Sequence, residues 1–322
     1  MSLTQRENTP SSAVIHQRLW PSRPLSEYVR SYEYVEARAA DIEASPFAVS
    51  VLPLLSFRLR SPGTAFEYAE GRARVLPPAI VLGPCDHRVA DVSYTGHLMN
   101  FTIVFEPAGF FRLFHVSPFE LRNYAYDVRN VLGERVARLH ARLLEALSPE
   151  QMVSIVEAVL LADVVDAEPC SRMQRAADVL LETKGRGELA EVANAAGLSA
   201  RSWRRHFVSE IGVAPKRYLR MLRFRHAIVL KRMAPARSWT QIGLEAGYYD
   251  QSHLIAEFHA MGGSAPSDFI RELASVPDIV AGAVYSRAGA QSCEPGRSPR
   301  LTEFYKSAGA FGGTMAGPGA MM

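Results

Sequence analysis

The chain has 322 residues, of which 48% are hydrophobic and 21% are charged, which is typical of a soluble globular protein with room for two domains. No apolar run approaches the ~20 residues of a membrane-spanning helix, and residues 1–10 lack the apolar core of a signal peptide. Three widely spaced cysteines, Cys85, Cys170 and Cys293, exclude a disulfide framework and favour a reducing cytoplasm.

The charge of the chain is unevenly distributed. The formal net charge is +3, yet residues 1–171 hold 16 Arg, no Lys and 20 acidic residues, a balance of −4. Residues 172–273 hold 16 basic and 10 acidic residues, a balance of +6, and Glu210 is the one acidic residue among 11 basic ones between Ser199 and Arg237. This basic segment predicts a polyanionic partner. The alternative is a solvated helix face that binds nothing.

The first part of the chain is strand-like. Over residues 19–121, apolar runs alternate with turn signals. Residues 47–59 are rich in β-branched side chains, and residues 75–82 form a run that Pro77-Pro78 interrupts, which predicts an edge strand or a bend. Residues 99–105 alternate as a half-buried strand does. We therefore expect a β-rich barrel or sandwich-like domain with a few helices.

Helical periodicity begins near Leu132 and continues to about Val165. Apolar residues three or four apart form one stripe there: Leu132, Val136, Leu139, Leu143 and Leu147. Pro149 then breaks this helix and begins another. The stripe has two interpretations, which are ordinary core packing and a contact with a second subunit.

The C-terminal part is expected to be helical. After a linker at residues 167–171, the pattern predicts helices or helix pairs at about 172–183, 188–211, 215–233, 238–262 and from Pro266 onward. Pro215 suits the start of the long helix because its missing N–H would be unpaired there. The predicted fold class is α+β, with three regions: an N-terminal effector or dimerisation domain (13–166), an all-α domain with two helix-turn-helix motifs joined by a long helix (172–275), and a flexible tail (276–322).

One short pattern occurs twice within residues 189–269. The copies are offset by 50 residues up to the turn, from Gly197 to Gly247, and by 51 after it, from Phe207 to Phe258. Each copy predicts a helix, a glycine-containing turn and a second helix opened by a capping residue, Ser199 or Asp250. This arrangement is a duplicated helix-turn-helix, which indicates DNA binding.

The repeat resembles the arabinose-regulator (AraC/XylS) family of bacterial transcription factors. The similarity covers residues 172–273 and rests on spaced positions in both copies: Ser199, Arg201, Trp203, Arg205, Phe207, Gly212, Pro215, Tyr218, Arg223 and Ala227, then Asp250, Gln251, Ser252, His253, Leu254, Phe258, Gly263 and Pro266. The resemblance implies seven helices and a long helix that holds two recognition helices about one DNA turn apart, on one face of the duplex. The front domain is similar to poorly characterised effector or dimerisation domains.

The first recognition helix has an anchoring side and a basic side. Trp203 and Phe207 are four residues apart and would face the domain core. The resemblance places base contacts at Arg201, Arg204 and Arg205, where an Arg fork can hold guanine O6 and N7. Phosphate contacts or solvated charges are the alternatives. The full set of predicted DNA-binding residues is Ser199, Arg201, Ser202, Arg204, Arg205, Arg220, Gln251, Ser252 and Ile255.

The second recognition helix departs from the family pattern. Ala256 stands where a basic residue would match Arg205, and Glu257 follows it. Gln251, which suits adenine, and Ile255, which suits a thymine methyl, would face the groove together with Ser252. Since this helix has no Arg or Lys, its attraction to phosphates should be weak. We therefore expect the first recognition helix to dominate DNA affinity.

Other candidate sites are weaker. Cys85-Asp86-His87, with His97 and Asp91 nearby in sequence, predicts either a metal site or, in preference, a turn with a structural histidine. Cys170 is a plain linker residue or a site of oxidation. Five aromatic residues are interpreted as core in preference to the lining of an effector pocket: Phe101, Phe105, Phe110, Phe111 and Phe114. No phosphate loop, catalytic carboxylate pair or Ser/His/Asp arrangement is found, so we assign no catalytic residue, metal or cofactor.

The main hypothesis is a sequence-specific DNA-binding transcription regulator that is cytoplasmic, nucleoid-associated and not an enzyme. Its expected partners are double-stranded DNA and a second copy of the chain, with a small-molecule effector and RNA polymerase as further candidates and no membrane. One alternative is a small-molecule-binding or enzymatic β domain with an accessory DNA-binding module. Another is a helical adaptor that uses the repeat for protein contacts.

Overall fold

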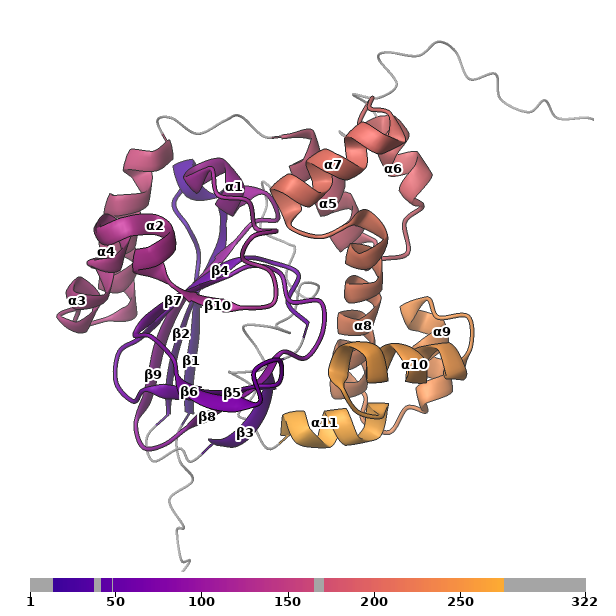
Figure 1. Ribbon diagram of the computed structural model, residues 1–322, viewed down its shortest axis with the longest axis horizontal. Coiled ribbons are helices and arrows are strands. Elements are labelled where there is room, and N and C mark those ends of the chain that lie inside the picture. Colours follow the sequence, from indigo (N-terminus) through magenta and orange to yellow (C-terminus); the bar gives the residue numbers. More distant parts are fainter. Residues whose placement is uncertain (1–13, 38–41, 48, 165–170, 275–322) are drawn as a thin grey trace, which may run out of the picture.

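The computed structural model describes residues 14–37, 42–47, 49–164 and 171–274. Within these ranges a β-rich N-terminal part is followed by a helical C-terminal part (Figure 1). The flexible tail expected at residues 276–322 lies outside the described residues. So do most of the predicted linker, Cys170 and Cys293.

The N-terminal part contains two antiparallel sheets. The strands of the six-stranded sheet, in spatial order, are β1 (Val14–Leu19), β2 (Val29–Ala37), β9 (Leu98–Phe105), β4 (Leu54–Arg58), β7 (Ala79–Leu82) and β10 (Ala125–Asp127). Those of the four-stranded sheet are β3 (Ile42–Phe47), β8 (Ala90–Tyr94), β5 (Gly63–Glu67) and β6 (Arg72–Val75). A short 3-10 helix, η1 (Arg23–Leu25), joins β1 to β2. The predicted β-rich domain is confirmed.

Two details of the strand predictions are corrected. The bend alternative holds at Pro77-Pro78, which separates β6 from β7, but β7 is not an edge strand because it pairs with both β4 and β10. β9 is almost fully buried, not half-buried. Its Phe101, Ile103 and Phe105 pack with the helices, while Thr102 faces the other sheet, so both faces of the strand are covered.

Four helices accompany the β domain: α1 (Gly109–Phe114), α2 (Val128–Ala137), α3 (Leu139–Leu144) and α4 (Pro149–Val164). The predicted single helix at 132–147 is wrong, because Gly133 takes a positive φ of 76° inside α2 and the stretch is divided into α2, which ends at Ala137, and α3, which begins at Leu139. The core interpretation is confirmed for most of its stripe, since Val136, Leu139 and Leu143 are buried against the six-stranded sheet. Leu147 is instead 93% exposed.

The C-terminal part has seven helices within residues 171–274, as the resemblance implies. They are α5 (Arg172–Glu182), α6 (Leu189–Ala195), α7 (Ala200–Ile211), α8 (Pro215–Met233), α9 (Trp239–Ala246), α10 (Gln251–Gly262) and α11 (Pro266–Ala274). Each predicted helix is present to within a few residues. Local signals account for this agreement, because side-chain oxygens cap α5, α7, α9 and α10 and Pro215 begins α8.

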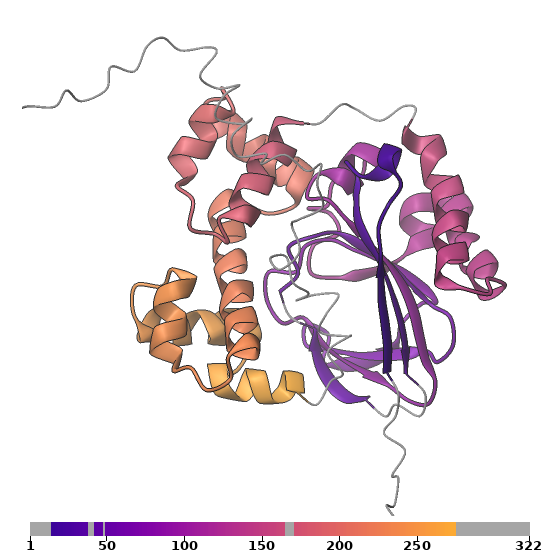
Figure 2. The same cartoon turned by 180° about the vertical axis from the view of Figure 1, so that it is seen from behind.

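The helical part packs directly onto the β domain. One hydrophobic core joins Val51 and Val104 of the β domain with Met173, Ile211 and Val213 of the helical part. Gln174 of α5 is buried at this boundary, and its side-chain oxygen accepts a 2.7 Å hydrogen bond from the backbone N–H of Ala108. In both views the helical part lies along one side of the β domain, and α2, α3 and α4 cover the other (Figures 1 and 2).

Candidate nucleic-acid interface and adjoining cavity

The first helix-turn-helix consists of α6 and α7. Ser199 caps α7 by accepting a 3.2 Å hydrogen bond from the backbone N–H of Ser202. Trp203 and Phe207 are buried with ring centroids 5.5 Å apart, and Phe207 also packs on Tyr218 of α8. The predicted anchoring side of α7 is therefore confirmed.

The opposite side of α7 is exposed and basic. Arg201, Arg204 and Arg205 are all solvent-exposed. Among the described residues, none of the three guanidinium groups has a hydrogen bond or an ion pair. Their charge is therefore available to an external anion. The neighbouring His206 is also exposed, a feature that the sequence motif did not single out.

The second helix-turn-helix consists of α9 and α10. Asp250 caps α10 through a 2.7 Å hydrogen bond from the backbone N–H of His253, and Leu254 and Phe258 are buried. Gln251 and Ser252 are exposed, and the Gln251 side-chain oxygen accepts a hydrogen bond from Thr240. This hydrogen bond to α9 orients the amide.

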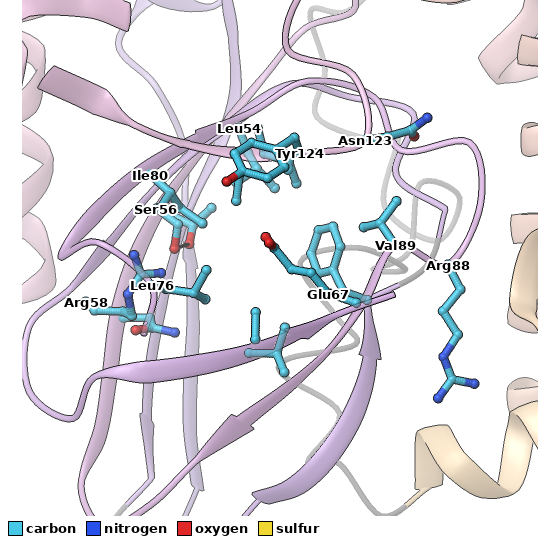
Figure 3. A pocket seen from close by; sticks show the side chains of 18 of the residues that line it. Leu54, Ser56, Arg58, Glu67, Leu76, Ile80, Arg88, Val89, Asn123 and Tyr124 are labelled. Atoms are coloured by element: carbon cyan, nitrogen blue, oxygen red, sulfur yellow. Dashed lines mark hydrogen bonds between the residues drawn. The ribbon is translucent and has the colours of Figure 1, made fainter. Parts of the chain in front are cut away.

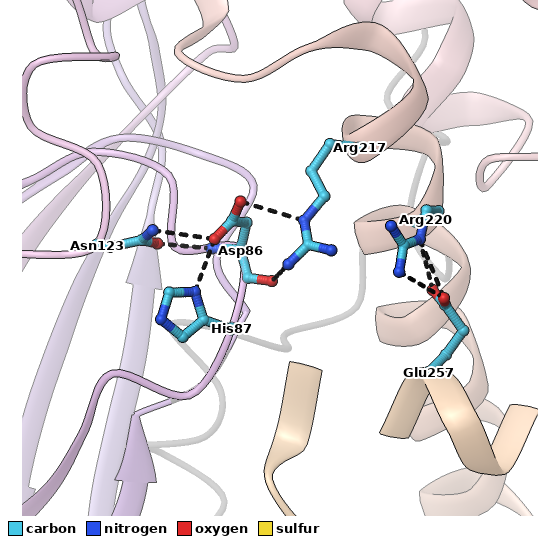
Figure 4. A network of polar contacts seen from close by, with 6 residues as sticks. All are labelled: Asp86, His87, Asn123, Arg217, Arg220 and Glu257. Carbon is cyan, nitrogen blue, oxygen red and sulfur yellow. Dashed lines mark hydrogen bonds and ion pairs between the residues drawn. The ribbon is translucent and has the colours of Figure 1, made fainter. Parts of the chain in front are cut away.

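Two further predicted DNA-binding residues, Ile255 and Arg220, also have internal contacts. Ile255 is half-buried and packs against the helical core, which limits how far it can reach into a groove. Arg220 of α8 forms a bidentate ion pair with Glu257 of α10, with nitrogen–oxygen distances of 2.7 to 3.0 Å (Figure 4). Glu257 is only 6% exposed, so it is not displayed to DNA, and its hydrogen bonds raise the pKa of Arg220. The pair joins the second recognition helix to α8.

The long helix α8 sets the spacing of the two motifs. The first motif lies at one end of α8 and the second at the other (Figure 1). Its 19 residues correspond to about 28 Å at 1.5 Å per residue. That length approaches the ~34 Å of one DNA turn, which separates successive major grooves on one face.

Comparison with known families agrees with this geometry. Residues 192–272 match the family model described as a helix-turn-helix domain. This segment is an AraC-type helix-turn-helix domain. No curated protein matches the chain.

Two solved structures give weak similarity over most of the chain. ToxT from Vibrio cholerae O395 has a TM-score of 0.43 and 12% identity, covering 77% of this chain and 100% of that one. Unsaturated fatty acid bound wild-type ToxT from Vibrio cholerae strain SCE256 has a TM-score of 0.42 and 12% identity, covering 84% and 99%. Similarity at this level indicates neither a shared ligand nor a shared mechanism.

The turn that follows β7 contacts the AraC-type domain. Asp86 accepts a hydrogen bond from Arg217 Nε at 3.1 Å, and its backbone oxygen accepts another from Arg217 Nη2 at 2.6 Å (Figure 4). Asn123 and His87 also contact the Asp86 carboxylate. Burial alone would raise the pKa of Asp86, but the His87 contact and the Arg217 charge hold it well below its usual range.

The same turn contains the residues that were considered as a metal site. Asp86 is engaged by cationic and amide groups, and Cys85 is buried, which raises the pKa of its thiol to about 12. Within the described ranges, no group of three or more His, Cys, Asp or Glu side chains is arranged to hold a metal. The preferred interpretation, a structural turn, fits these contacts.

Arg88 forms a second contact between the two parts. Its backbone N–H donates to the Met261 carbonyl at 2.7 Å, and its guanidinium pairs with Glu272 of α11 and with Asp91. Sequence reasoning missed these residues, because Arg88 and Glu272 are 184 positions apart and no local motif connects them.

A cavity of about 580 Å³ lies between the two sheets (Figure 3). None of the five phenylalanines considered as pocket lining borders it, and Phe101, Phe105 and Phe110 are buried in the core beneath the helices. The pocket interpretation of those residues is therefore wrong. His87, Arg88 and Val89 line the cavity, so the turn that touches the AraC-type domain also forms part of the cavity wall.

No helix in the described ranges combines the length and apolar character that crossing a membrane requires.

Proposed function

We propose that the protein is a sequence-specific transcription regulator in which α7 provides most of the DNA affinity and the β domain senses an effector. The observation that carries the proposal is the contrast between the two recognition helices. α7 exposes three arginines without internal partners, whereas α10 contains no Arg or Lys. Because phosphate neutralisation supplies much of the free energy of DNA binding, the arginine-bearing helix should dominate.

The two helices would contribute in different ways. On α7, an arginine that reaches a guanine edge would contribute about 1–3 kcal/mol of base discrimination. On α10, the exposed Gln251 suits adenine, and Ser252 and Ser199 are positioned for polar contacts. Ile255 is the least accessible member of the set, and Arg220 would act through its ion pair with Glu257 by positioning α10.

The asymmetry is tested by titrating a footprinted operator with Arg205→Ala and Gln251→Ala proteins. We expect Arg205→Ala to raise the Kd by roughly 10- to 100-fold and Gln251→Ala to raise it less. Arg271→Ala removes an exposed arginine on α11 and is the matched control for loss of one positive charge. A larger loss with Gln251→Ala would refute the assignment of α7 as the dominant helix.

The salt dependence of the Kd for DNA gives a second test of the same proposal. Each phosphate contact adds about 0.9 to the slope of log Kd against log salt concentration. A protein without Arg201, Arg204 and Arg205 should therefore show a shallower slope by up to about 3. A slope that is the same in wild-type and triple-alanine proteins would show that these side chains do not contact phosphates.

Effector sensing would use the cavity and the turn at residues 85–91. Residues of this turn line the cavity on one side, while Asp86 and Arg88 hold the AraC-type domain on the other. A ligand that shifts the turn would change how firmly α8 and α11 are held against the β domain. Hydrogen–deuterium exchange of residues 215–220 and 261–272, with and without effector, measures this coupling. Unchanged exchange would argue against this route.

We propose three further properties. The protein forms homodimers, for which exposed leucines of the β domain such as Leu144 and Leu147 offer a surface. It works in the cytoplasm at the nucleoid, and it contacts RNA polymerase at regulated promoters. Analytical ultracentrifugation of wild-type and Leu147→Glu proteins tests the dimer surface, and a wild-type protein that remains monomeric at micromolar concentration contradicts it.

A further inference from the structure

The cavity has walls from both sheets. Alternate residues of β4 and β9 face it from the larger sheet, and β5 and β8 close it from the smaller one (Figure 3). Most of the lining is apolar, including Val35, Leu54, Leu76, Ile80 and Val92. Its volume of about 580 Å³ lies within the range of pockets that hold small organic ligands.

Most polar groups in the lining already have partners inside the protein. Glu33 contacts His16, Arg18 and Ser31, and Ser56 is hydrogen-bonded to Thr102. Toward the AraC-type domain, the remaining polar groups are paired in the same way: Asn123 with Asp86, Tyr68 with Asp91, and Arg88 with Asp91 and Glu272. These groups therefore need no partner from a ligand.

Four buried side-chain atoms of the lining have no hydrogen-bond partner among the described residues. They are Nε and Nη2 of Arg58, Oε2 of Glu67 and Oδ1 of Asn100. A polyhydroxylated ligand would need many more uncommitted groups than these, because each buried hydroxyl requires a partner. The pattern fits instead a largely apolar ligand with one strongly polar end.

Arg58 is the most unusual of these residues. It is only 4% exposed, and its side chain points into the cavity. Its backbone is fixed on both sides, since its N–H donates to Pro78 at 2.8 Å and its carbonyl accepts from His140 at 2.7 Å. Burial lowers the pKa of Arg58, and Tyr94 is the neighbouring group that opposes this effect. A buried guanidinium whose Nε and Nη2 lack partners is a site for an anion, since an uncompensated buried charge is costly.

We propose that the cavity binds a small monocarboxylic acid with an apolar body, whose carboxylate accepts hydrogen bonds from Nε and Nη2 of Arg58. The parallel N–H groups of an arginine match the two oxygens of a carboxylate. The apolar body lies against Leu54, Leu76 and Ile80. Glu67, whose other oxygen pairs with Arg74, presents a carboxylate to the cavity and disfavours a second acidic group on the ligand. This inference rests on the proposed role of the β domain as the effector-sensing part.

Isothermal titration of the full-length protein tests the inference with four acids: octanoate, decanoate, phenylacetate and cinnamate. Each acid is paired with its primary amide, which has the same shape and no charge. We expect at least one acid to bind with a Kd at least about tenfold lower than that of its amide. If no acid binds more tightly than its amide, the inference is overturned.

Three variants test whether the tighter binding of the acid than of its amide depends on the cavity. Arg58→Gln should abolish the difference between acid and amide, while Arg58→Lys should keep part of it. Ala65→Leu fills the cavity from β5 and should weaken the acid and the amide alike. An acid preference that persists in Arg58→Gln overturns the inference, as does unchanged binding in Ala65→Leu. Circular dichroism of each variant verifies folding, and Arg58→Lys serves as the decisive comparison if Arg58→Gln does not fold.

DNA binding of the same wild-type preparation separates this inference from the proposed function. Salt-sensitive DNA binding without acid binding refutes the ligand assignment and leaves the DNA-binding function intact. Acid binding without DNA binding refutes the proposed regulator and leaves the Arg58 site intact.

Discussion

We expect His226 to make the stability of the AraC-type domain depend on pH. This residue of α8 is only 7% exposed, and neither ring nitrogen has a hydrogen-bond partner among the described residues. Burial, together with the positive charges of Lys184 and Arg186, lowers the pKa of His226 from 6.5 to about 4. The folded protein therefore holds this imidazole neutral at pH values where the unfolded chain binds a proton.

The difference between the folded and unfolded pKa of His226 sets the direction and the size of the change in stability with pH. Because the pKa is lower in the folded state, the stabilising contribution is fully present above pH 6.5 and is lost as the pH falls toward 4. Between pH 7 and pH 5 the loss is about 2 kcal/mol of unfolding free energy. Carboxylates whose pKa is lowered in the folded state, such as Glu33 and Asp86, lose their contributions mainly below pH 4.5, outside this interval.

The measurement is urea unfolding at pH 5 and pH 7, followed by circular dichroism of the helical signal. His226→Gln keeps a polar side chain of similar size but cannot be protonated, so its stability should change by about 2 kcal/mol less than that of wild type over the same interval. His259→Gln, which replaces an exposed histidine of α10, is the matched control and should behave as wild type. Equal pH dependence in wild-type and His226→Gln proteins would refute the argument.

Three further predictions concern packing and the contact between the two parts. A double-mutant cycle of Asp86→Ala and Arg217→Ala should give a coupling of about 1–3 kcal/mol in urea unfolding, since both side chains are partly buried, and a coupling near zero would mean that the pair is not formed in solution. Phe258→Ala should destabilise the AraC-type domain by about 3–5 kcal/mol in the same assay, because the ring is buried among other aromatics; a loss below 1 kcal/mol would contradict that packing. Gly247→Ala should lower the thermal midpoint by an amount equivalent to about 1–2 kcal/mol, because Gly247 has φ of 85°, and an unchanged midpoint would argue against that backbone conformation.

The helical part was predictable because its signals are local. Ser199, Asp250 and Pro215 mark helix starts through contacts within a few residues, and glycine marks the turn between α9 and α10. The failed single helix at 132–147 shows the limit of such reasoning. The leucine stripe continues through Gly133, but periodicity cannot reveal that the backbone there takes a positive φ.

In the β domain, the sequence indicated which residues alternate but not what covers each face. The alternation of residues 99–105 was visible, yet solvent was assigned to a face that a second sheet covers. The phenylalanines were interpreted as core in preference to pocket lining, and the position of the helices shows that Phe101, Phe105 and Phe110 are core. Period-two alternation distinguishes the two faces of a strand without identifying their neighbours.

By itself, then, the sequence determined the duplicated helix-turn-helix, its caps, its long connecting helix and the unequal charge of its two recognition helices. These are properties of short segments or of composition, so they do not depend on how distant segments meet. Only the tertiary structure decided that Asp86 meets Arg217, that Arg220 is paired with Glu257, and that Arg58 faces a cavity with two unpartnered nitrogens. These contacts join residues far apart in the chain, and their formation depends on the packing of whole sheets and helices.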